Sequence, residues 1–260
     1  MREITAFKQI CHNFAQECPS VKRHTLLIIR AMSLLRDVKE LLLPRLCPVC
    51  GKLLMQSEDV MCAFCAVGLP RYRVTNIDDN KLLRMIWDKA DIKKGMTFLA
   101  YNHHSPYHNL IIDFKYHGMS DLAFRLGQWA ALEAKKHGFW EEADALVPVP
   151  LNWRKRWHRG YNQAEMLARG MSEVTGLPML NLLRRIENRT SQTKLKGEAR
   201  IKNAEGIYKA INIPDEWRGK RFVLVDDVMT TGSTLANCAL ALQSADENAE
   251  ICIFPLAYAG

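Results

Sequence analysis

A short stretch near the carboxyl end of the chain places the tightest limits on its fold. Residues 222–225 are Phe-Val-Leu-Val, aspartates follow at 226 and 227, and a loop of Thr, Gly and Ser leads into a helical pattern from about residue 233. Continuous aliphatic residues are typical of a parallel strand covered on both faces. A strand, a polar loop and a helix in this order predict an α/β domain with a mainly parallel sheet.

The loop after this strand is suited to bind a phosphate group. Helix N-termini expose unpaired N–H groups and a partial positive charge, and hydroxyl side chains add further donors. A glycine lets the main chain approach an anion closely. We therefore expect the loop to surround the phosphate of a phosphosugar with Thr230, Thr231, Gly232, Ser233 and Thr234.

Two carboxylates precede the loop. Asp226 and Asp227 are expected to leave the strand at its carboxyl end, the usual ligand crevice of an open α/β sheet, where they can accept hydrogen bonds from vicinal hydroxyls. Intervening hydroxyls and Mg²⁺ would relieve their repulsion toward a phosphate. One alternative is the magnesium-holding strand of a P-loop NTPase, although the chain has no G-x-x-x-x-G-K-[ST] segment. The other is a plain strand-to-helix cap.

Residues 223–234 resemble the loop that binds 5-phosphoribosyl 1-pyrophosphate (PRPP) in type I phosphoribosyltransferases. In that family, two acidic residues hold the ribose hydroxyls and the following loop holds the 5-phosphate, which implies the catalytic pair Asp226 and Asp227 here. From about Cys47 to the C-terminus the chain is similar to the ComF family of competence-associated proteins. The segments that carry this similarity are Phe114–Gly118, Val147–Pro150, Arg159–Gln163 and Thr190–Leu195.

The resemblance implies an overall architecture and a set of ligands. The expected fold is a type I phosphoribosyltransferase-like, mainly parallel sheet flanked by helices, with a small N-terminal zinc ribbon of four cysteines. The expected ligand is PRPP with Mg²⁺, and the expected context is DNA uptake in natural transformation, with the competence machinery as partner. Two hypotheses stay open: transfer of the phosphoribosyl group to an unknown acceptor, and non-catalytic binding of single-stranded DNA on the same fold.

Four of the eight cysteines form two C-x-x-C pairs, Cys47 with Cys50 and Cys62 with Cys65. Four thiolates at this spacing suit a tetrahedral zinc ion, whereas a disulfide interpretation needs oxidising surroundings. Four protein ligands leave no open position for chemistry, so the predicted zinc is structural. Incidental thiols are the alternative.

Cations crowd the segment that follows the predicted strand 143–149. Residues 153–221 contain sixteen Lys and Arg against seven Asp and Glu, enough to account for the net charge of +8 of the whole chain. By resemblance, the loop after this strand binds pyrophosphate through forked guanidinium contacts from Arg154, Arg156 and Arg159. Trp153 and Trp157 beside them equally favour single-stranded nucleic acid, with bases stacked on the rings.

Residues 190–200 match the position of the flexible loop that closes over PRPP in phosphoribosyltransferases. Its candidate ligands are Gln192, Lys194 and Arg200. A mobile lid of this kind would exclude water from the reaction. The alternative is an ordinary solvated loop, which charged runs usually are.

The remaining pattern alternates strands with helices. Strands are expected at residues 96–101, 143–149, 221–227 and 250–257, and helices at 107–116, 122–136 and 162–174. We expect residues 1–31 to be a disordered or artefactual extension with translation starting at Met32, residues 32–70 to form a helix and the zinc ribbon, and residues 90–260 to form the phosphoribosyltransferase-like domain. No apolar run approaches the roughly 18 residues needed to cross a bilayer. The most apolar candidate, residues 26–35, lacks the small-residue cleavage site of a secretory signal, so we expect a cytoplasmic protein.

Overall fold

The computed structural model describes residues 44–102, 104–108, 110–111, 119–186 and 207–260, without the side chains of residues 154 and 155. The chain divides into two compact units, residues 1–47 with 51–59 and residues 48–50 with 60–260. The expected N-terminal extension (1–31), residues 32–43 of the expected helix and zinc ribbon, and the expected flexible lid (190–200) lie outside the described residues. No helix within the described ranges is long and apolar enough to cross a membrane.

The described part of the first unit is a tight reversal of the chain. Leu46 pairs with Leu53 as an antiparallel bridge, and the Gly51 N–H donates to the Cys47 carbonyl at 2.8 Å. Gly51 has a φ of +70°, a left-handed conformation that glycine adopts without the steric cost of a Cβ atom. The guanidinium of Arg45 donates to the carbonyls of Met55 and Glu58 and so closes the loop.

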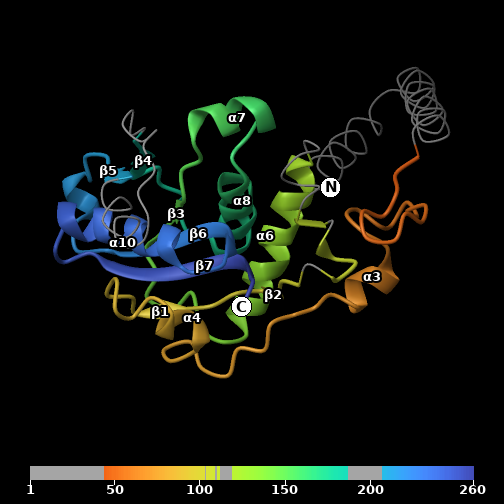
Figure 1. Cartoon of the computed structure of the whole chain (residues 1–260), viewed down its shortest axis with the longest axis horizontal. Coiled ribbons are helices and arrows are strands. Elements are labelled where there is room, and N and C mark those ends of the chain that lie inside the picture. The colour runs from red at the N-terminus through yellow and green to blue at the C-terminus, as the bar shows by residue number, and fades with distance from the viewer. Residues whose placement is uncertain (1–43, 103, 109, 112–118, 187–206) are drawn as a thin grey trace, which may run out of the picture. The chain divides into compact units, whose positions relative to one another are not determined.

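The second unit is built on a five-stranded parallel sheet (Figure 1). Its order is β1 (Lys94–Gly95), β7 (Glu250–Tyr258), β6 (Arg221–Met229) and β3 (Ala145–Pro148), and β2 (Leu99–Ala100) also pairs with β7. Phe222 to Val225 of β6 are fully buried, as their continuous apolar character predicts. The expected mainly parallel α/β architecture is confirmed.

Helices pack on the sheet in two groups. α6 (Ser120–Lys135) and α8 (Gln163–Thr175) lie against each other and contact β3, β6 and β7. A Cβ atom on Gly170 would lie 2.0 Å from the Phe124 carbonyl oxygen, so the glycine is what lets the two helices approach so closely. In a separate core cluster, α10 (Ser233–Ala245) and α4 (Lys81–Arg84) pack with Phe222 and Leu224.

The remaining described elements are short: α3 (Ala63–Val67), α7 (Trp153–Arg159), the antiparallel pair β4 (Leu183–Arg185) and β5 (Tyr208–Ala210), and a 3₁₀ helix at Asp215–Trp217. The cationic segment expected as a loop after β3 is therefore helical. Of the strand expected at 96–101, only β2 (99–100) forms, and β1 (94–95) lies just before the expected range. The helix expected at 107–116 lies partly outside the described residues.

One difference from the expected elements changes the geometry of the candidate site. β6 does not end at Asp227 but continues to Met229, because Val228 and Met229 still pair with Ala257 and Tyr258 of β7. The two aspartates therefore lie within the strand rather than after it. Side chains of a strand alternate between the two faces of the sheet. Asp226 thus shares a face with Phe222 and Leu224, and Asp227 points to the other face.

Candidate functional site

The two aspartates line one polar cavity of about 210 Å³ at the C-terminal edge of the sheet. Their carboxylates are oriented by the main chain of the same strand. The N–H of Asp227 donates to Asp226 Oδ1 at 2.8 Å, and the N–H of Val228 donates to Asp227 Oδ1 at 2.6 Å. The backbone thus fixes one oxygen of each carboxylate and sets the direction in which the pair borders the cavity.

The turn from β6 to α10 surrounds a second, smaller cavity of about 30 Å³. All five loop residues predicted to bind phosphate line it: Thr230, Thr231, Gly232, Ser233 and Thr234. Gly232 has a φ of +72° and directly precedes the helix, whose first residue is Ser233 as the sequence predicts. A Cβ atom on Gly232 would lie 2.7 Å from Ile86 Cγ1, so both the conformation and the space require glycine. Asp226 and Thr234 border this cavity and the larger one, and the two cavities therefore adjoin.

Of the three arginines predicted to bind pyrophosphate, only Arg159 lines the larger cavity within the described residues. Arg159 Nη1 donates to Gln163 Oε1 at 3.1 Å. Arg156 instead forms an ion pair with Glu165 at 3.6 Å. The side chain of Arg154 lies outside the described part of the structure.

The start of α8 adds two polar side chains to the cavity wall. Asn162 caps the helix by accepting from the Ala164 N–H at 3.2 Å, and its amide donates to the Val149 carbonyl at 3.0 Å, so its role is structural. Gln163 is 2% exposed, and its Nε2 meets no acceptor at hydrogen-bonding geometry. Burial raises the pKa of the neighbouring Tyr161 to about 12, although Arg159 and Gln163 act in the opposite direction. Gln163 thus lines the cavity and interacts with Tyr161 and Arg159.

The β4–β5 hairpin contributes Arg185 and Tyr208, which the sequence analysis did not single out. Arg185 Nη1 donates to the Tyr208 hydroxyl at 3.4 Å, and the guanidinium carbon lies 5.5 Å from the ring centroid. Burial raises the pKa of Tyr208 to about 12, so the phenol is neutral near pH 7. Arg185 follows another arginine in an ordinary basic strand, and no local pattern separates it from a solvated cation.

A tyrosine paired with a histidine is close enough to Asp227 to feel its charge. The hydroxyl of Tyr101 and Nδ1 of His108 are 2.6 Å apart. Burial raises the pKa of Tyr101, and the charge of Asp227 raises it further. The charge of Asp226 likewise contributes to the raised pKa of Tyr208, so both phenols are neutral near pH 7.

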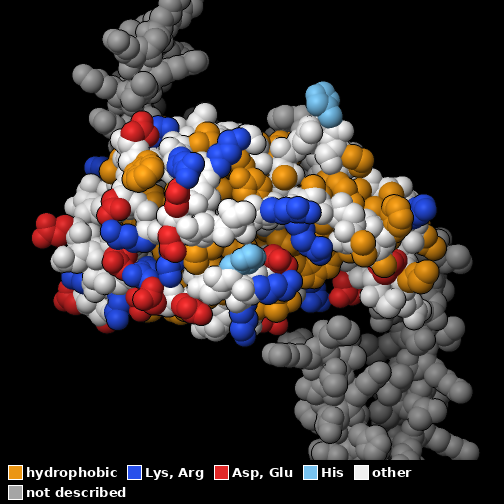
Figure 2. All heavy atoms as spheres, turned by 90° about the horizontal axis from the view of Figure 1, so that it is seen from below, with side chains coloured by type: hydrophobic (Ala, Val, Ile, Leu, Met, Phe, Trp, Pro, Cys, Tyr) orange, Lys and Arg blue, Asp and Glu red, His pale blue; other side chains and the backbone are white. Residues whose placement is uncertain are grey.

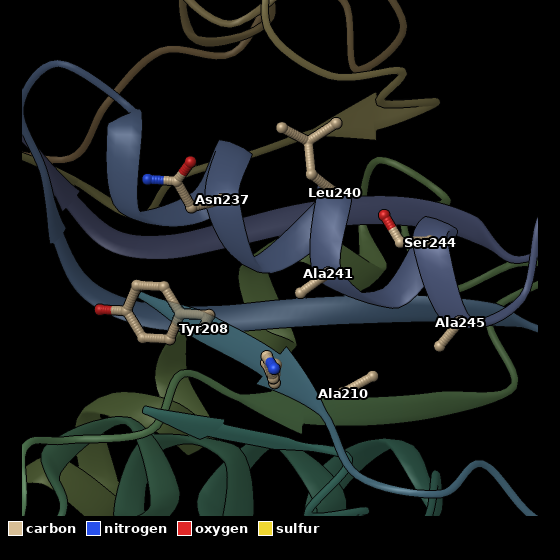
Figure 3. Close-up of a pocket in the computed structure, with 8 residues that line it drawn as sticks. Tyr208, Ala210, Asn237, Leu240, Ala241, Ser244 and Ala245 are labelled. Carbon is tan, nitrogen blue, oxygen red and sulfur yellow. The ribbon is translucent and has the colours of Figure 1, made fainter. Parts of the chain in front are cut away.

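A larger cavity of about 490 Å³ lies nearby, between α10 and β5 (Figure 3). Tyr208 borders it together with small or neutral side chains of α10, including Ala241, Ser244 and Asn237. Among the described residues of its lining, Lys209 is the one with a charged side chain. This lining offers neither carboxylates nor guanidinium groups, so the smaller polar cavities are the better candidates for an anionic ligand.

The four predicted zinc ligands come together. One Sγ atom from each of Cys47, Cys50, Cys62 and Cys65 lies within 4.8 Å of all the others. The Sγ atoms of Cys50 and Cys62 are 3.7 Å apart, close to the separation of about 3.8 Å in a tetrahedral site with Zn–S bonds of about 2.3 Å. The donor set and its spacing fit a structural zinc ion.

No protein-family model matches the chain. Among curated proteins, it is similar to competence protein F of Haemophilus influenzae, with 36% identity over 112 residues, covering 43% of this chain and 49% of that protein. Competence protein ComFC of Bacillus subtilis is 28% identical over 213 residues, covering 81% of this chain and 77% of that protein. DNA utilization protein YhgH of Escherichia coli K12 is 30% identical over 141 residues, covering 53% and 61%.

Solved structures that align with this one include the glutamine PRPP amidotransferase of B. subtilis, at 19% identity and a TM-score of 0.38, covering 55% of this chain and 30% of that chain. Adenine phosphoribosyltransferase of Leishmania tarentolae matches at 11% identity and a TM-score of 0.36, covering 72% and 94%. The sequence match spans about half the length of the Haemophilus protein and about three quarters of ComFC. By sequence, the chain is similar to competence proteins and DNA utilization proteins.

Proposed function

We propose that the chain binds PRPP together with Mg²⁺ at the C-terminal edge of its sheet and acts in DNA uptake. One observation carries the proposal: two adjoining cavities combine a pair of carboxylates, two guanidinium groups and a hydroxyl-rich turn at a helix N-terminus. A ribose that carries a phosphate at one end and a pyrophosphate at the other needs this combination. The names of the relatives, competence and DNA utilization proteins, support the biological context.

Each part of PRPP has a matching part of the site. Asp226 and Asp227 accept hydrogen bonds from the ribose hydroxyls, and residues 230–234 hold the 5-phosphate through N–H groups and hydroxyls. Arg159 binds the pyrophosphate, assisted by Arg154 from the same helix. When bound, Mg²⁺ neutralises charge on the pyrophosphate, and the two aspartates are the carboxylates that would hold it.

In this proposal the site also transfers the phosphoribosyl group to an acceptor. The protein residues position the ribose and stabilise the departing pyrophosphate, which needs no protein nucleophile. Release of pyrophosphate from PRPP in the presence of a panel of nucleobases tests the transfer. Release that depends on one base supports it, and no release with any base leaves a binding protein.

Thermal unfolding with and without PRPP and Mg²⁺ tests the binding itself. Wild-type protein is expected to gain stability as PRPP exceeds its Kd, and the double variant Asp226→Asn/Asp227→Asn is expected to show no gain. Asp215→Asn is the matched control, because Asp215 lies on the surface and pairs only with Arg218 among the interactions described. A wild-type protein that does not respond to PRPP contradicts the proposal.

A second candidate function is binding of single-stranded DNA along α7. Trp153 and Trp157 lie one helical turn apart and are 58% and 86% exposed, beside Arg156 and His158. Exposed aromatic rings between cations can stack bases and contact phosphates. On the face drawn in Figure 2, by contrast, acidic and basic side chains are interspersed. If PRPP has no effect but a labelled oligonucleotide binds in a salt-dependent way that Trp157→Ala weakens, this becomes the function.

We also propose that Cys47, Cys50, Cys62 and Cys65 hold a structural zinc ion. Metal analysis of the purified protein is expected to give about one zinc per chain. Cys62→Ser removes a ligand and is expected to lower the zinc content, whereas Cys238→Ser, at a buried thiol of α10, is not. Zinc-free wild-type protein with four reactive thiols would contradict the assignment.

A further inference from the structure

The cavity formed by the 230–234 turn carries too little positive charge to balance a bound phosphate. Among the residues that the structure describes, its lining includes Asp226 but no Lys, Arg or His. A phosphate monoester carries a charge of about −1.5 to −2 near pH 7, so it is repelled by the carboxylate. The helix N-terminus offsets this with about half a positive charge. A cation from outside the turn would therefore strengthen phosphate binding.

Lys89 lies next to this turn, although it is 142 positions away from Thr231 in the chain. Its Nζ donates to the Thr231 carbonyl at 3.4 Å and to the Met85 carbonyl at 3.1 Å. An ammonium group has three N–H donors, and these two carbonyls accept two of them. The positive charge thus lies beside the turn, and within the described part of the chain the third donor has no protein acceptor, so it can bind an anion.

The segment that carries Lys89 is itself fixed against the turn. Ile86 is fully buried, and its side chain occupies the space that a Cβ atom on Gly232 would need. The N–H groups of Lys89 and Ala90 both donate to the Ile86 carbonyl, at 2.7 and 3.1 Å. Ile86 therefore anchors both the glycine of the turn and the short reversal of the chain from which Lys89 extends.

We propose that Lys89 is a phosphate-binding residue of this site and provides the positive charge that the 230–234 turn lacks. The assignment rests on the proposed function and deepens it, because it adds a positively charged residue to the end of the site that holds the sugar phosphate. Lys89 thereby couples the segment before β1 to the phosphate end of the ligand. The pyrophosphate end of the ligand is bound by the arginines of the 210 Å³ cavity.

Calorimetric titration with three ligands, each with Mg²⁺, separates the two ends of the site: ribose 5-phosphate, inorganic pyrophosphate and PRPP. Lys89→Gln is expected to lower the affinity for ribose 5-phosphate and for PRPP roughly 10-fold, which corresponds to one lost hydrogen bond to a charged group. Its affinity for pyrophosphate is expected to be unchanged. Lys89→Arg is expected to retain most of the affinity. The control is Lys93→Gln, which should retain all of it, because Lys93 pairs with Asp91 at 2.9 Å.

A thermal melt without ligand distinguishes phosphate binding from a purely structural role. Lys89→Gln is expected to melt within about 1 °C of the wild type, because an exposed side chain contributes little stability. Unchanged affinity of Lys89→Gln for ribose 5-phosphate, or an equal loss for pyrophosphate, overturns the assignment of Lys89 while the proposed function stands. A wild-type protein that binds none of the three ligands overturns the proposed function itself.

Discussion

The two ends of strand β6 hold their charges in different ways. At the N-terminal end, Arg221 Nε donates to Glu250 Oε2 at 2.7 Å, and a second nitrogen of the same guanidinium pairs with Glu142. Lys94 also reaches Glu142, at 3.2 Å. At the C-terminal end, Asp226, Asp227 and two arginines line a cavity of about 210 Å³. The first group of charges is satisfied within the chain, whereas the second is arranged around space for a ligand.

This difference separates stability from binding along a single strand. The ion pairs join the starts of β1, β6 and β7, which come from distant parts of the sequence. Glu142 holds a φ of +67°, which is unfavourable for a residue with a Cβ atom, and its two cationic partners help to keep it there. Changes at the N-terminal end of β6 should lower stability without affecting binding. Changes at the C-terminal end should weaken binding without affecting stability.

The largest expected effect belongs to Asp226→Asn. We expect its affinity for PRPP with Mg²⁺ to fall roughly 100-fold, because ribose and metal contacts to a charged acceptor are both weakened. Its unfolding free energy should stay within about 0.5 kcal/mol of the wild type. Calorimetry and urea unfolding measure the two quantities. A variant that unfolds more easily but binds normally would reverse the comparison.

Gly232→Ala tests the one position where the two properties are expected to be linked. The added methyl group would lie 2.7 Å from Ile86 and would hold a φ of +72°. We expect a loss of about 2 kcal/mol in unfolding free energy and a weaker response to ribose 5-phosphate, both from the same distortion. Urea unfolding with a parallel titration checks this. Gly176→Ala is the control for φ alone, because Gly176 has a φ of +77° and no neighbour within 4 Å of the added atom.

Arg221→Met should change stability alone. The arginine side chain is 19% exposed and has two acidic partners, so removing its charge leaves Glu142 and Glu250 without their shared cation. We expect about 1 kcal/mol of destabilisation, since both partners are partly solvated. Affinity for PRPP should not change. Equal affinity losses in Arg221→Met and Asp226→Asn would show that the two ends are coupled.

The parts of this architecture that sequence could predict are those encoded locally. The buried run 222–225, the polar turn and the helix start at Ser233 are contiguous, and the four cysteines follow a regular spacing. The end of β6 was misplaced because two aspartates suggest a strand end. Pairing with β7 instead extends the strand to Met229, and so puts the two carboxylates on opposite faces.

The remaining site residues depend on contacts between distant segments. Arg185 and Tyr208 reach the cavity through a hairpin whose strands are separated by more than twenty residues. Lys89 meets its partner across 142 positions, and the Arg221–Glu142 pair spans 79. Each of these residues has an ordinary local sequence. Only contacts between segments far apart in the sequence distinguish them from surface charges.

The smallest expected effect is a pH dependence confined to the N-terminal end of β6. Hydrogen bonds from Arg221, and to a smaller extent from Lys94, hold the pKa of Glu142 below its ordinary value of 4.5. As pH falls below 4.5, the unfolded chain takes up this proton before the folded one, so the stability that the carboxylate contributes declines and is lost once pH passes the folded pKa. Glu142→Gln lacks this contribution at every pH. Urea midpoints measured between about pH 6 and about pH 3 should therefore fall less steeply for Glu142→Gln than for wild type or for the surface control Glu216→Gln. Parallel declines in all three proteins would mean that the ion pairs at this end contribute nothing to the acid sensitivity of the fold.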